Sequence, residues 1–357
     1  MKIVFLNIYQ DLVNRGAETF VCELAKRLSK NHEVVVVQGG SSKKNYQIIK
    51  IGGVSLFPTD KPDVGWRVFH KFYLDRYSRQ VFTFTKKALP YIKKIKPDWV
   101  VPLNGFWQLW QLKRLQKTQK FKILVSGQAG PGKDDYWNLR LKPDVFVALT
   151  ESFGQWAQKA SKKIKIVVIP NGVDLEKYNK KVKPKELNFP KPIILCVGAL
   201  VPYKNIDLTI RAVSKLPKAS LIVLGEGPME KFLRKMGQEL LPNRFLMVSV
   251  SPEEIPSFYS AADVFTLASG RSEAFGIAYV EALASGKAIV APCDPAKKEI
   301  IGNAGVFFDP KNVNSYVQSF KLALRKKWHD LPQKQAEKFS WDKIAKDYEK
   351  ILEEDPR

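Results

Sequence analysis

Short, continuous apolar runs alternate with amphipathic helical segments along the chain, and this alternation restricts the fold more than any other feature of the sequence. Lys2–Asn7 is the first such run, Ala17–Leu28 has apolar residues at helical spacing, and Glu33–Val37 is a β-branched run that ends before two glycines. Strands that are apolar at nearly every position and separated by helices predict a parallel sheet covered on both faces. The further strands expected in this half are 99–103, 122–125, 145–149 and 166–169.

A second series of the same kind follows a Lys- and Pro-rich stretch, Lys180–Pro192, which we interpret as a linker. It begins with a strand at 193–197 and a helix at 207–216. The further strands expected in this half are 221–224, 245–248, 264–267, 288–291 and 306–308.

The sequence therefore predicts an α/β protein of two Rossmann-like domains, at residues 1–175 and 190–335. A closing helix within 341–357 is expected to pack back on the first domain. Because doubly wound sheets bind their ligands at the carboxyl ends of the strands, we expect a functional cleft between the domains.

The composition excludes several classes of protein. The chain starts with an apolar run too short for a signal peptide and contains no stretch near the roughly 20 apolar residues that span a bilayer, so we expect a cytoplasmic protein, soluble or peripheral to the membrane. The three cysteines are widely spaced and the three histidines lack metal-ligand spacing. We therefore predict no metal site and no bound cofactor.

Positive charge is concentrated in the first half of the chain. The formal net charge is +24, and residues 1–170 hold 30 Lys and Arg against 12 Asp and Glu, whereas residues 171–357 hold 29 against 23. The first half is therefore expected to attract anionic partners.

The segment 269–281 is the most informative for chemistry. Glu273 is expected on a loop after a strand, and Glu281 on the helix that follows. Gly276 allows backbone to approach a ligand closely, and the first amides of a helix are unpaired donors that suit a phosphate or sugar hydroxyls. Taken alone, the same pattern also fits two solvated or capping glutamates.

This segment resembles glycosyltransferase family 4, the retaining enzymes with the GT-B fold, and the related group 1 glycosyltransferases. The match rests on the Glu-x7-Glu spacing and on its filling, EAFGIAYVEALASGKAIVA. The resemblance implies that Glu273 lies beside the donor sugar, that Glu281 holds the ribose, and that the backbone of Ala274, Phe275, Gly276 and Ile277 meets the sugar.

Two further segments resemble the family's phosphate-binding loops. Gly198 ends a strand and Lys204 precedes a helix, where a lysine could neutralise a pyrophosphate leaving group. Ala199 stands where the family usually has an arginine, which implies one phosphate contact fewer. Gly16 matches the second glycine of the family's Gly-Gly-Ala-Glu loop, and Arg15 replaces the first, so we expect a stiffer and more basic loop.

The acceptor side is less well defined by the sequence. Many relatives carry a histidine on a middle loop of the first domain, where this chain offers Gln128. A glutamine can hold a hydroxyl but cannot take its proton. We interpret Gln128 as a substrate contact, with Asp134 and Asp135 as acceptor ligands.

Residues 61–96 combine ten Lys and Arg with two Asp and eight aromatic residues. Such a surface suits an anionic membrane and a lipid-linked acceptor, although an ordinary helix pair with aromatics in the core gives the same pattern.

The resulting expectation is a retaining glycosyltransferase that moves a hexose from a nucleotide-diphosphate sugar to a glycan or lipid-linked acceptor. Another GT-B enzyme, such as a sugar-nucleotide epimerase or a phosphorylase, is the alternative within enzymes. A basic nucleic-acid-binding protein is the alternative of a different class, but the sequence contains no recognisable nucleic-acid module and we expect no nucleic acid as partner. An inactive scaffold of the same fold is a third.

Overall fold

The structure is a computed structural model that describes residues 1–13, 15–40, 44–54, 72–270 and 273–354. The chain divides into two compact units. The first comprises Met1–Asn171 together with Trp341–Arg357, and the second comprises Gly172–Ser340.

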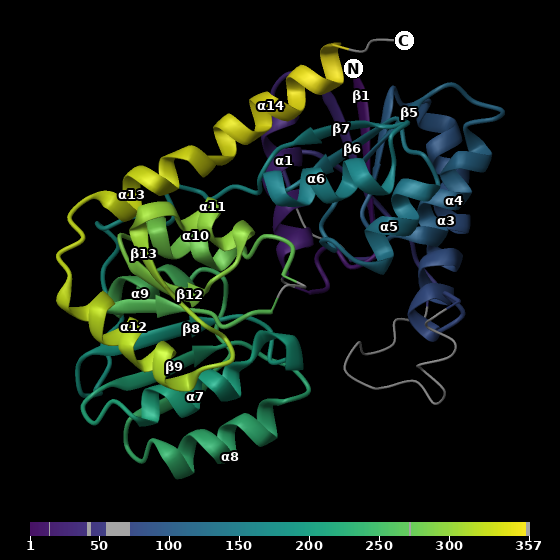
Figure 1. Ribbon diagram of the computed structural model, residues 1–357. Coiled ribbons are helices and arrows are strands. Elements are labelled where there is room, and N and C mark those ends of the chain that lie inside the picture. The colour runs from purple at the N-terminus through teal and green to yellow at the C-terminus, as the bar shows by residue number, and fades with distance from the viewer. Residues whose placement is uncertain (14, 41–43, 55–71, 271–272, 355–357) are drawn as a thin grey trace. The chain divides into compact units, whose positions relative to one another are not determined.

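The first unit is built on a parallel sheet of seven strands in the order β3-β2-β1-β4-β5-β6-β7 (Figure 1). The strands are β1 (Lys2–Asn7), β2 (Glu33–Gln38), β3 (Gln47–Lys50), β4 (Trp99–Pro102), β5 (Lys122–Ser126), β6 (Val145–Ala148) and β7 (Lys165–Val168). The helices are α1 (Gly16–Leu28), α3 (Arg76–Ile95), α4 (Phe106–Leu115), α5 (Lys133–Arg140), α6 (Glu151–Ala160) and α14 (Trp341–Glu354). Strands β1, β2 and β4 are buried along nearly their whole length, so both faces of the sheet are covered, as the continuous apolar runs predict.

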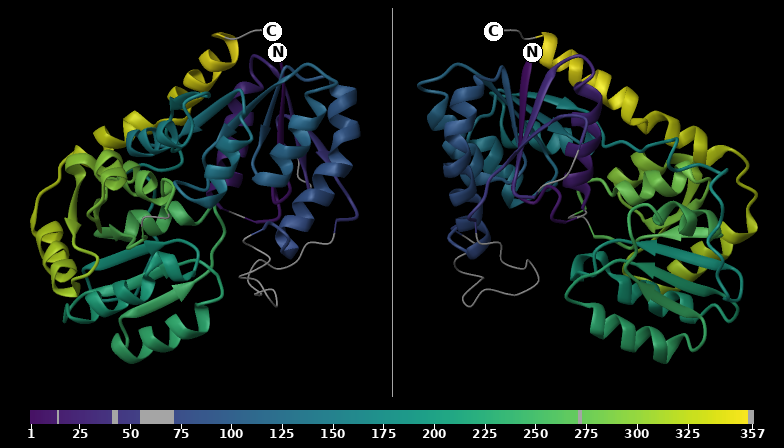
Figure 2. Two further views of the ribbon diagram at one scale, coloured as in Figure 1. Left: turned by 45° about the vertical axis from the view of Figure 1, so that its right-hand side comes forward. Right: turned by 180° about the vertical axis from the view of Figure 1, so that it is seen from behind.

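The last helix of the chain completes the core of this unit. Helix α14 lies against α1, and Figure 2 shows the two helices together from behind. Trp341 and Tyr348 both contact Phe20 of α1, with ring centroids 6.3 and 5.6 Å apart. The Trp99 indole N–H donates to the Leu352 carbonyl at 3.2 Å. Residues more than 300 positions apart in the sequence therefore share one hydrophobic cluster.

The second unit has a parallel sheet of six strands in the order β10-β9-β8-β11-β12-β13. The strands are β8 (Ile193–Val197), β9 (Ser220–Leu224), β10 (Phe245–Val248), β11 (Val264–Thr266), β12 (Ala288–Pro292) and β13 (Gly305–Phe308). The helices are α7 (Ile206–Ser214), α8 (Glu230–Leu240), α9 (Ile255–Ala261), α10 (Ile277–Ala284), α11 (Pro295–Ile301), α12 (Val313–Arg325) and α13 (Leu331–Ala336). Three 3-10 turns, η1 (Pro202–Lys204), η2 (Gly302–Ala304) and η3 (Glu337–Phe339), join these elements.

The stretch Lys180–Pro192, interpreted from the sequence as a linker, belongs to the second unit. The Lys185 amide donates to the Ser257 carbonyl at 2.9 Å, and the Ser260 hydroxyl donates to the Val182 carbonyl at 2.6 Å. These hydrogen bonds hold the stretch against α9. The Pro- and Lys-rich composition reflects an irregular segment on the surface of a unit and not a free connection.

Part of the basic segment 61–96 lies outside the described residues, which resume at Phe72. Within α3, Phe84 is buried and Phe82 packs edge-on against Trp107 at 5.4 Å, so these aromatics belong to the core. The solvent side of α3 is basic. In the described parts of the chain, no helix has both the length and the apolar character needed to cross a bilayer.

Candidate active site

Lys204 and Glu273 meet at the carboxyl end of β8. The strand leads through Gly198 into η1, whose last residue is Lys204, and the Lys204 ammonium donates to the Glu273 carboxylate. The Lys204 residue is only 9% exposed, and the Glu273 side chain is also largely covered. A buried ion pair satisfies both charges in the absence of a ligand, and an anion beside the lysine would compete with the glutamate for it.

Hydrogen bonds between the two loops hold this pair in place. The Gly270 amide donates to the Tyr203 carbonyl, and the Asn205 side chain donates to the Ala268 carbonyl, both at 2.9 Å. Asn205 has a left-handed backbone, with φ of 49°, which ends η1 and starts α7. Two segments about 65 residues apart thus form one rigid corner. Arg271 and Ser272 of the same loop lie outside the described residues.

Gly276 starts helix α10 and cannot be replaced without strain. Its φ is 83°, and a Cβ there would lie 2.7 Å from the Tyr279 ring. Gly276, Ala274 and Ile277 are half-exposed, so their backbone is accessible at the start of the helix. Phe275 points inward, is 2% exposed and packs against Phe339 at 5.8 Å, so it can contribute only backbone to a ligand.

Glu281 lies one turn further along α10 and is half-buried. The Tyr259 hydroxyl donates to its Oε2 at 3.0 Å. Burial raises the pKa of Glu281, and the hydrogen bonds from Tyr259 and Tyr178 act in the opposite direction. The carboxylate is oriented by tyrosines and can still accept from a further hydroxyl.

The glycines around β8 differ in what the fold demands of them. A Cβ on Gly225 would collide with the Gly198 carbonyl, and one on Gly227 would lie 2.7 Å from the Leu200 carbonyl, so both are required by the packing of two loops. A Cβ on Gly198 would meet Leu267 and Lys204 at 3.7 and 3.8 Å, which are ordinary contact distances. Among its described residues, the second unit therefore does not require glycine at 198.

In the first unit, Gly16 is exposed at the start of α1. Arg15 does not leave the loop as basic as the sequence suggested. Its Nε and Nη2 each donate to the Glu18 carboxylate at 3.3 Å, and its guanidinium lies 5.0 Å from the Tyr9 ring centroid. Glu18 is buried, so the two charges neutralise each other within one helical turn.

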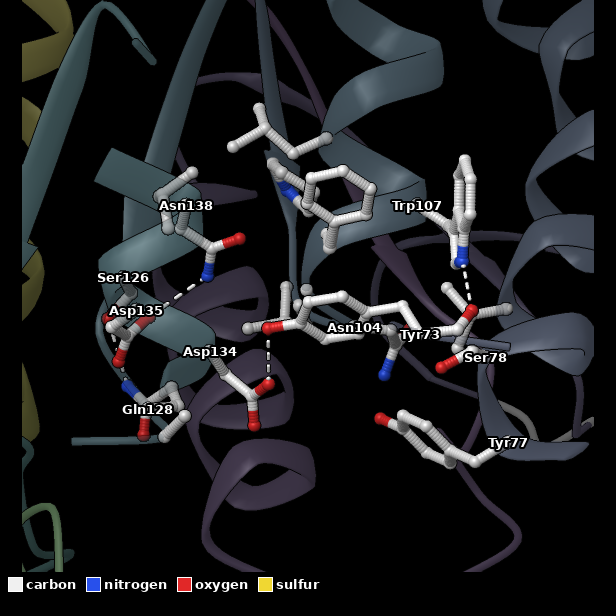
Figure 3. A pocket seen from close by; sticks show the side chains of 18 residues that line it. Tyr73, Tyr77, Ser78, Asn104, Trp107, Ser126, Gln128, Asp134, Asp135 and Asn138 are labelled. Carbon is white, nitrogen blue, oxygen red and sulfur yellow. Dashed lines mark hydrogen bonds between the residues drawn. The ribbon is translucent and has the colours of Figure 1, made fainter. Parts of the chain in front are cut away.

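Gln128, Asp134 and Asp135 line one pocket of about 100 Å³ in the first unit, at the carboxyl ends of β4 and β5 (Figure 3). The Gln128 amide is engaged from both ends. Its Nε2 donates to Ser126 Oγ at 2.9 Å and to Asn171 Oδ1 at 3.0 Å, and its Oε1 accepts from Asn171 at 2.9 Å. Gln128 therefore shapes the pocket wall, and only the second lone pair of its carbonyl remains for a ligand.

The two aspartates differ in environment. Asp134 accepts from the Tyr73 hydroxyl at 2.8 Å. Asp135 is 1% exposed, and burial raises its pKa from 3.8 to about 7 while the Asn138 side chain and the Gly130 and Ala129 amides lower it. A carboxyl of this kind can gain or lose its proton near neutral pH.

Two sequence profiles together match nearly the whole chain. The profile of "Glycosyl transferases group 1" matches residues 177–353, and that of "Glycosyltransferase Family 4" matches residues 14–177. The chain belongs to the group 1 glycosyltransferases.

Curated relatives of this glycosyltransferase are distant. The lipopolysaccharide 1,2-N-acetylglucosaminetransferase of Salmonella typhimurium is 23% identical over 95% of this chain and 94% of that protein. The sulfoquinovosyl transferase SQD2 of Arabidopsis thaliana is 28% identical over 43% of this chain, and the match spans only 32% of that protein.

Solved structures superpose on this chain over nearly its full length. The sucrose-phosphate synthase of Thermosynechococcus elongatus superposes with a TM-score of 0.82 at 18% identity, covering 99% of this chain and 98% of the other. At this identity the likeness shows the fold alone, which is GT-B.

Two groups of residues in this glycosyltransferase were missed by sequence reasoning. One is the tyrosine pair that orients Glu281. The other is the aromatic wall of the pocket, which includes Tyr73, Phe106 and Trp107. Phe106 and Trp107 start the helix that comes three residues after the buried strand β4, which is the one local signal that could have pointed to them.

Three side chains that could ligate a metal ion also come together in the first unit, which the histidine spacing did not predict. Ligand atoms of His32, Glu349 and Glu353 lie within 4.8 Å of one another. His32 Nε2 lies 2.9 Å from Glu349 Oε1, and the Asn31 side-chain amide donates to that oxygen at 2.9 Å. These contacts attach α14 to the end of α1, and we interpret the cluster as structural.

Proposed function

We propose that this protein is a retaining hexosyltransferase whose second unit holds a nucleotide-diphosphate sugar and whose first unit holds the acceptor. The observation that carries the proposal is the buried pair of Lys204 and Glu273 beside Gly198. It combines a cation for a leaving pyrophosphate, a carboxylate for sugar hydroxyls, and a glycine that packing against the described residues does not require.

The proposed reaction needs no protein base. The bond between the anomeric carbon and the diphosphate oxygen breaks, and the Lys204 ammonium stabilises the negative charge that develops on the diphosphate. The acceptor hydroxyl attacks from the face that the diphosphate leaves, and its proton passes to the departing phosphate oxygen. Glu273 orients the transferred sugar, and the amides of Gly276 and Ile277 approach the donor. Glu281 accepts from the ribose hydroxyls.

Thermal-shift measurements with UDP, GDP, ADP and dTDP, each beside its sugar conjugates, test the donor site. We expect one diphosphate to raise the melting temperature of the full chain selectively. The rise should be lost in Glu281→Ala and kept in Glu239→Ala, a matched change of an exposed residue on α8. Absence of a rise with every nucleotide would favour an inactive scaffold, which the alanine at position 199 also permits.

Once the donor is known, the stereochemistry can be measured directly. NMR of the product formed from an α-linked nucleotide sugar should show an α-glycosidic bond. A β-linked product would contradict the retaining mechanism.

A lipid-linked or membrane-borne acceptor is the finer part of the proposal. The solvent side of α3 carries Arg79, Lys86, Lys93 and Lys94 beside exposed Tyr91. Cations and an aromatic ring on one exposed face suit an anionic headgroup region. When phosphatidylglycerol vesicles are pelleted at physiological salt, the wild type should therefore be found in the pellet, and a variant with both Lys93→Glu and Lys94→Glu should stay in the supernatant. Equal pelleting of both proteins would contradict this part.

A further inference from the structure

We propose that the pocket of the first unit binds an uncharged sugar ring, whose hydroxyls donate to Asp135 and Asn138 while its apolar face rests on the aromatic wall. Assigning this ring to the acceptor rests on the proposed function. The consequence is a defined substrate class: the acceptor presents a neutral glycosyl residue to the first unit, and not a phosphate- or carboxylate-bearing one.

Two buried oxygen atoms of the pocket are not satisfied by an ordinary hydrogen bond from any described residue. Asp135 and Asn138 are 1% and 6% exposed, and Asn138 Nδ2 donates to Asp135 Oδ1 at 2.9 Å. Asp135 Oδ2 and Asn138 Oδ1 make no hydrogen bond of ordinary geometry among the described residues, although the Gly130 and Ala129 amides lie close enough to the Asp135 carboxyl to lower its pKa. Figure 3 shows the Asn138 carbonyl pointing into the pocket, above Asp135. Buried acceptors without donors are unfavourable, and a ligand that brings hydroxyl groups supplies the missing donors.

The aromatic wall is held in place by contacts that do not involve a ligand. The rings of Tyr73 and Phe106 stack at 5.0 Å with an interplanar angle of 11°, and Trp107 meets Phe106 edge-on at 5.1 Å. The Trp107 indole N–H donates to the Tyr73 carbonyl at 2.7 Å. A preformed apolar wall opposite a few polar groups is the usual composition of a site for a small ligand.

The charges around the pocket select against anions. The two carboxyl groups of Asp134 and Asp135 both line it, and a phosphate or a sugar carboxylate would be placed beside them. Lys133 lies with its Nζ 3.9 Å from the Tyr73 ring centroid, in contact with that ring. Because burial raises the pKa of Asp135 to about 7, the carboxyl is partly neutral at physiological pH. A neutral hydroxyl, which both donates and accepts, therefore suits it better than a full cation.

Saturation-transfer NMR on the full chain tests the proposal with defined probes. The neutral probes are the methyl α-glycosides of glucose, galactose, mannose and N-acetylglucosamine, and the anionic probes are glucose 6-phosphate and methyl glucuronide. We expect at least one neutral glycoside to bind and the anionic probes to bind at least about ten-fold more weakly. Failure of every neutral glycoside to bind, or equal binding of the anionic probes, would overturn the proposal.

Asp135→Asn and Asn138→Leu should each weaken the neutral glycoside about ten-fold, which corresponds to one lost hydrogen bond. Asp347→Asn, an exposed carboxylate of α14 in the same unit, is the matched control and should bind like the wild type. Unchanged binding in both pocket variants would place the glycoside elsewhere and overturn the assignment.

The nucleotide thermal shift separates this proposal from the proposed function. A nucleotide response without glycoside binding refutes the pocket alone. Glycoside binding that depends on Asp135, without any nucleotide response, refutes the transferase activity and leaves the pocket standing.

Discussion

Replacing Asp135 by asparagine is expected to stabilise this protein above neutral pH. The carboxyl is 1% exposed, and burial raises its pKa from 3.8 to about 7. A rise of that size means that ionisation of Asp135 lowers the free energy of unfolding at pH 8 by about 4 kcal/mol. An amide has the same shape and no charge, and its N–H can donate to Asn138 Oδ1, which lacks a donor among the described residues.

The pH dependence follows from the direction of this change. A raised pKa means that the folded protein holds its proton to higher pH than the unfolded chain does. The contribution of Asp135 to stability is therefore fully present below about pH 4, falls as the pH rises toward 7, and is constant above that. The advantage of Asp135→Asn should be near zero at pH 4 and should reach its maximum, at most about 4 kcal/mol, above pH 7.

Urea unfolding followed by tryptophan fluorescence at pH 5, 6, 7 and 8 measures this effect. Seven of the eight tryptophans lie in residues 1–171 and 341–357, so the signal reports mainly on the first unit. Asp347→Asn, which removes an exposed carboxylate of the same unit, should show no pH-dependent difference from the wild type. A less stable Asp135→Asn protein at pH 8, or a difference that does not vary with pH, would refute the reasoning. A gain in stability together with a loss of glycoside binding would mark Asp135 as a ligand-binding residue, since a purely structural residue would lose both.

Three further predictions concern the second unit and the closing helix. Gly225→Ala should lower the free energy of unfolding, measured in urea, by more than about 2 kcal/mol, because its Cβ would collide with the Gly198 carbonyl. Gly198→Ala should unfold like the wild type in urea, but calorimetry should show that it binds the diphosphate at least about ten-fold more weakly. Because burial raises the pKa of Glu281, the nucleotide affinity of the wild type should begin to fall at a higher pH than an ordinary glutamate would give. Glu281→Gln should bind the nucleotide more weakly, with an affinity that does not vary with pH. A wild-type affinity that does not vary with pH would count against the ribose contact. Trp341→Ala should destabilise the first unit by roughly 3–5 kcal/mol in urea unfolding, because it empties the contact between α14 and α1, and an unchanged midpoint would contradict that role.

The sequence by itself determined the class of the fold and most of its strands. Lys2–Asn7, Ile193–Val197 and Phe245–Val248 are strands with the predicted bounds, because short runs that are apolar at successive positions and alternate with helices are typical of a parallel sheet covered on both faces. Strand β3 (Gln47–Lys50) escaped prediction because it lies at the edge of the sheet and is only half covered, so its pattern carries no such signal. The family motif around Glu273 could also be recognised from the sequence, because its residues lie close together along the chain.

Only the tertiary structure decided which distant residues act together. Lys204 and Glu273 pair across 69 positions because parallel strands bring their carboxyl ends to one edge of a sheet. Tyr73, just before α3, reaches Asp134 across 61 positions because both line the pocket at the carboxyl ends of β4 and β5. The Asp135 and Asn138 oxygens that make no ordinary hydrogen bond among the described residues could not be predicted from composition, because whether a polar atom has a partner depends on packing and not on residue type. Local periodicity determines the helices and strands of this protein, and long-range packing determines which side chains come together in its sites.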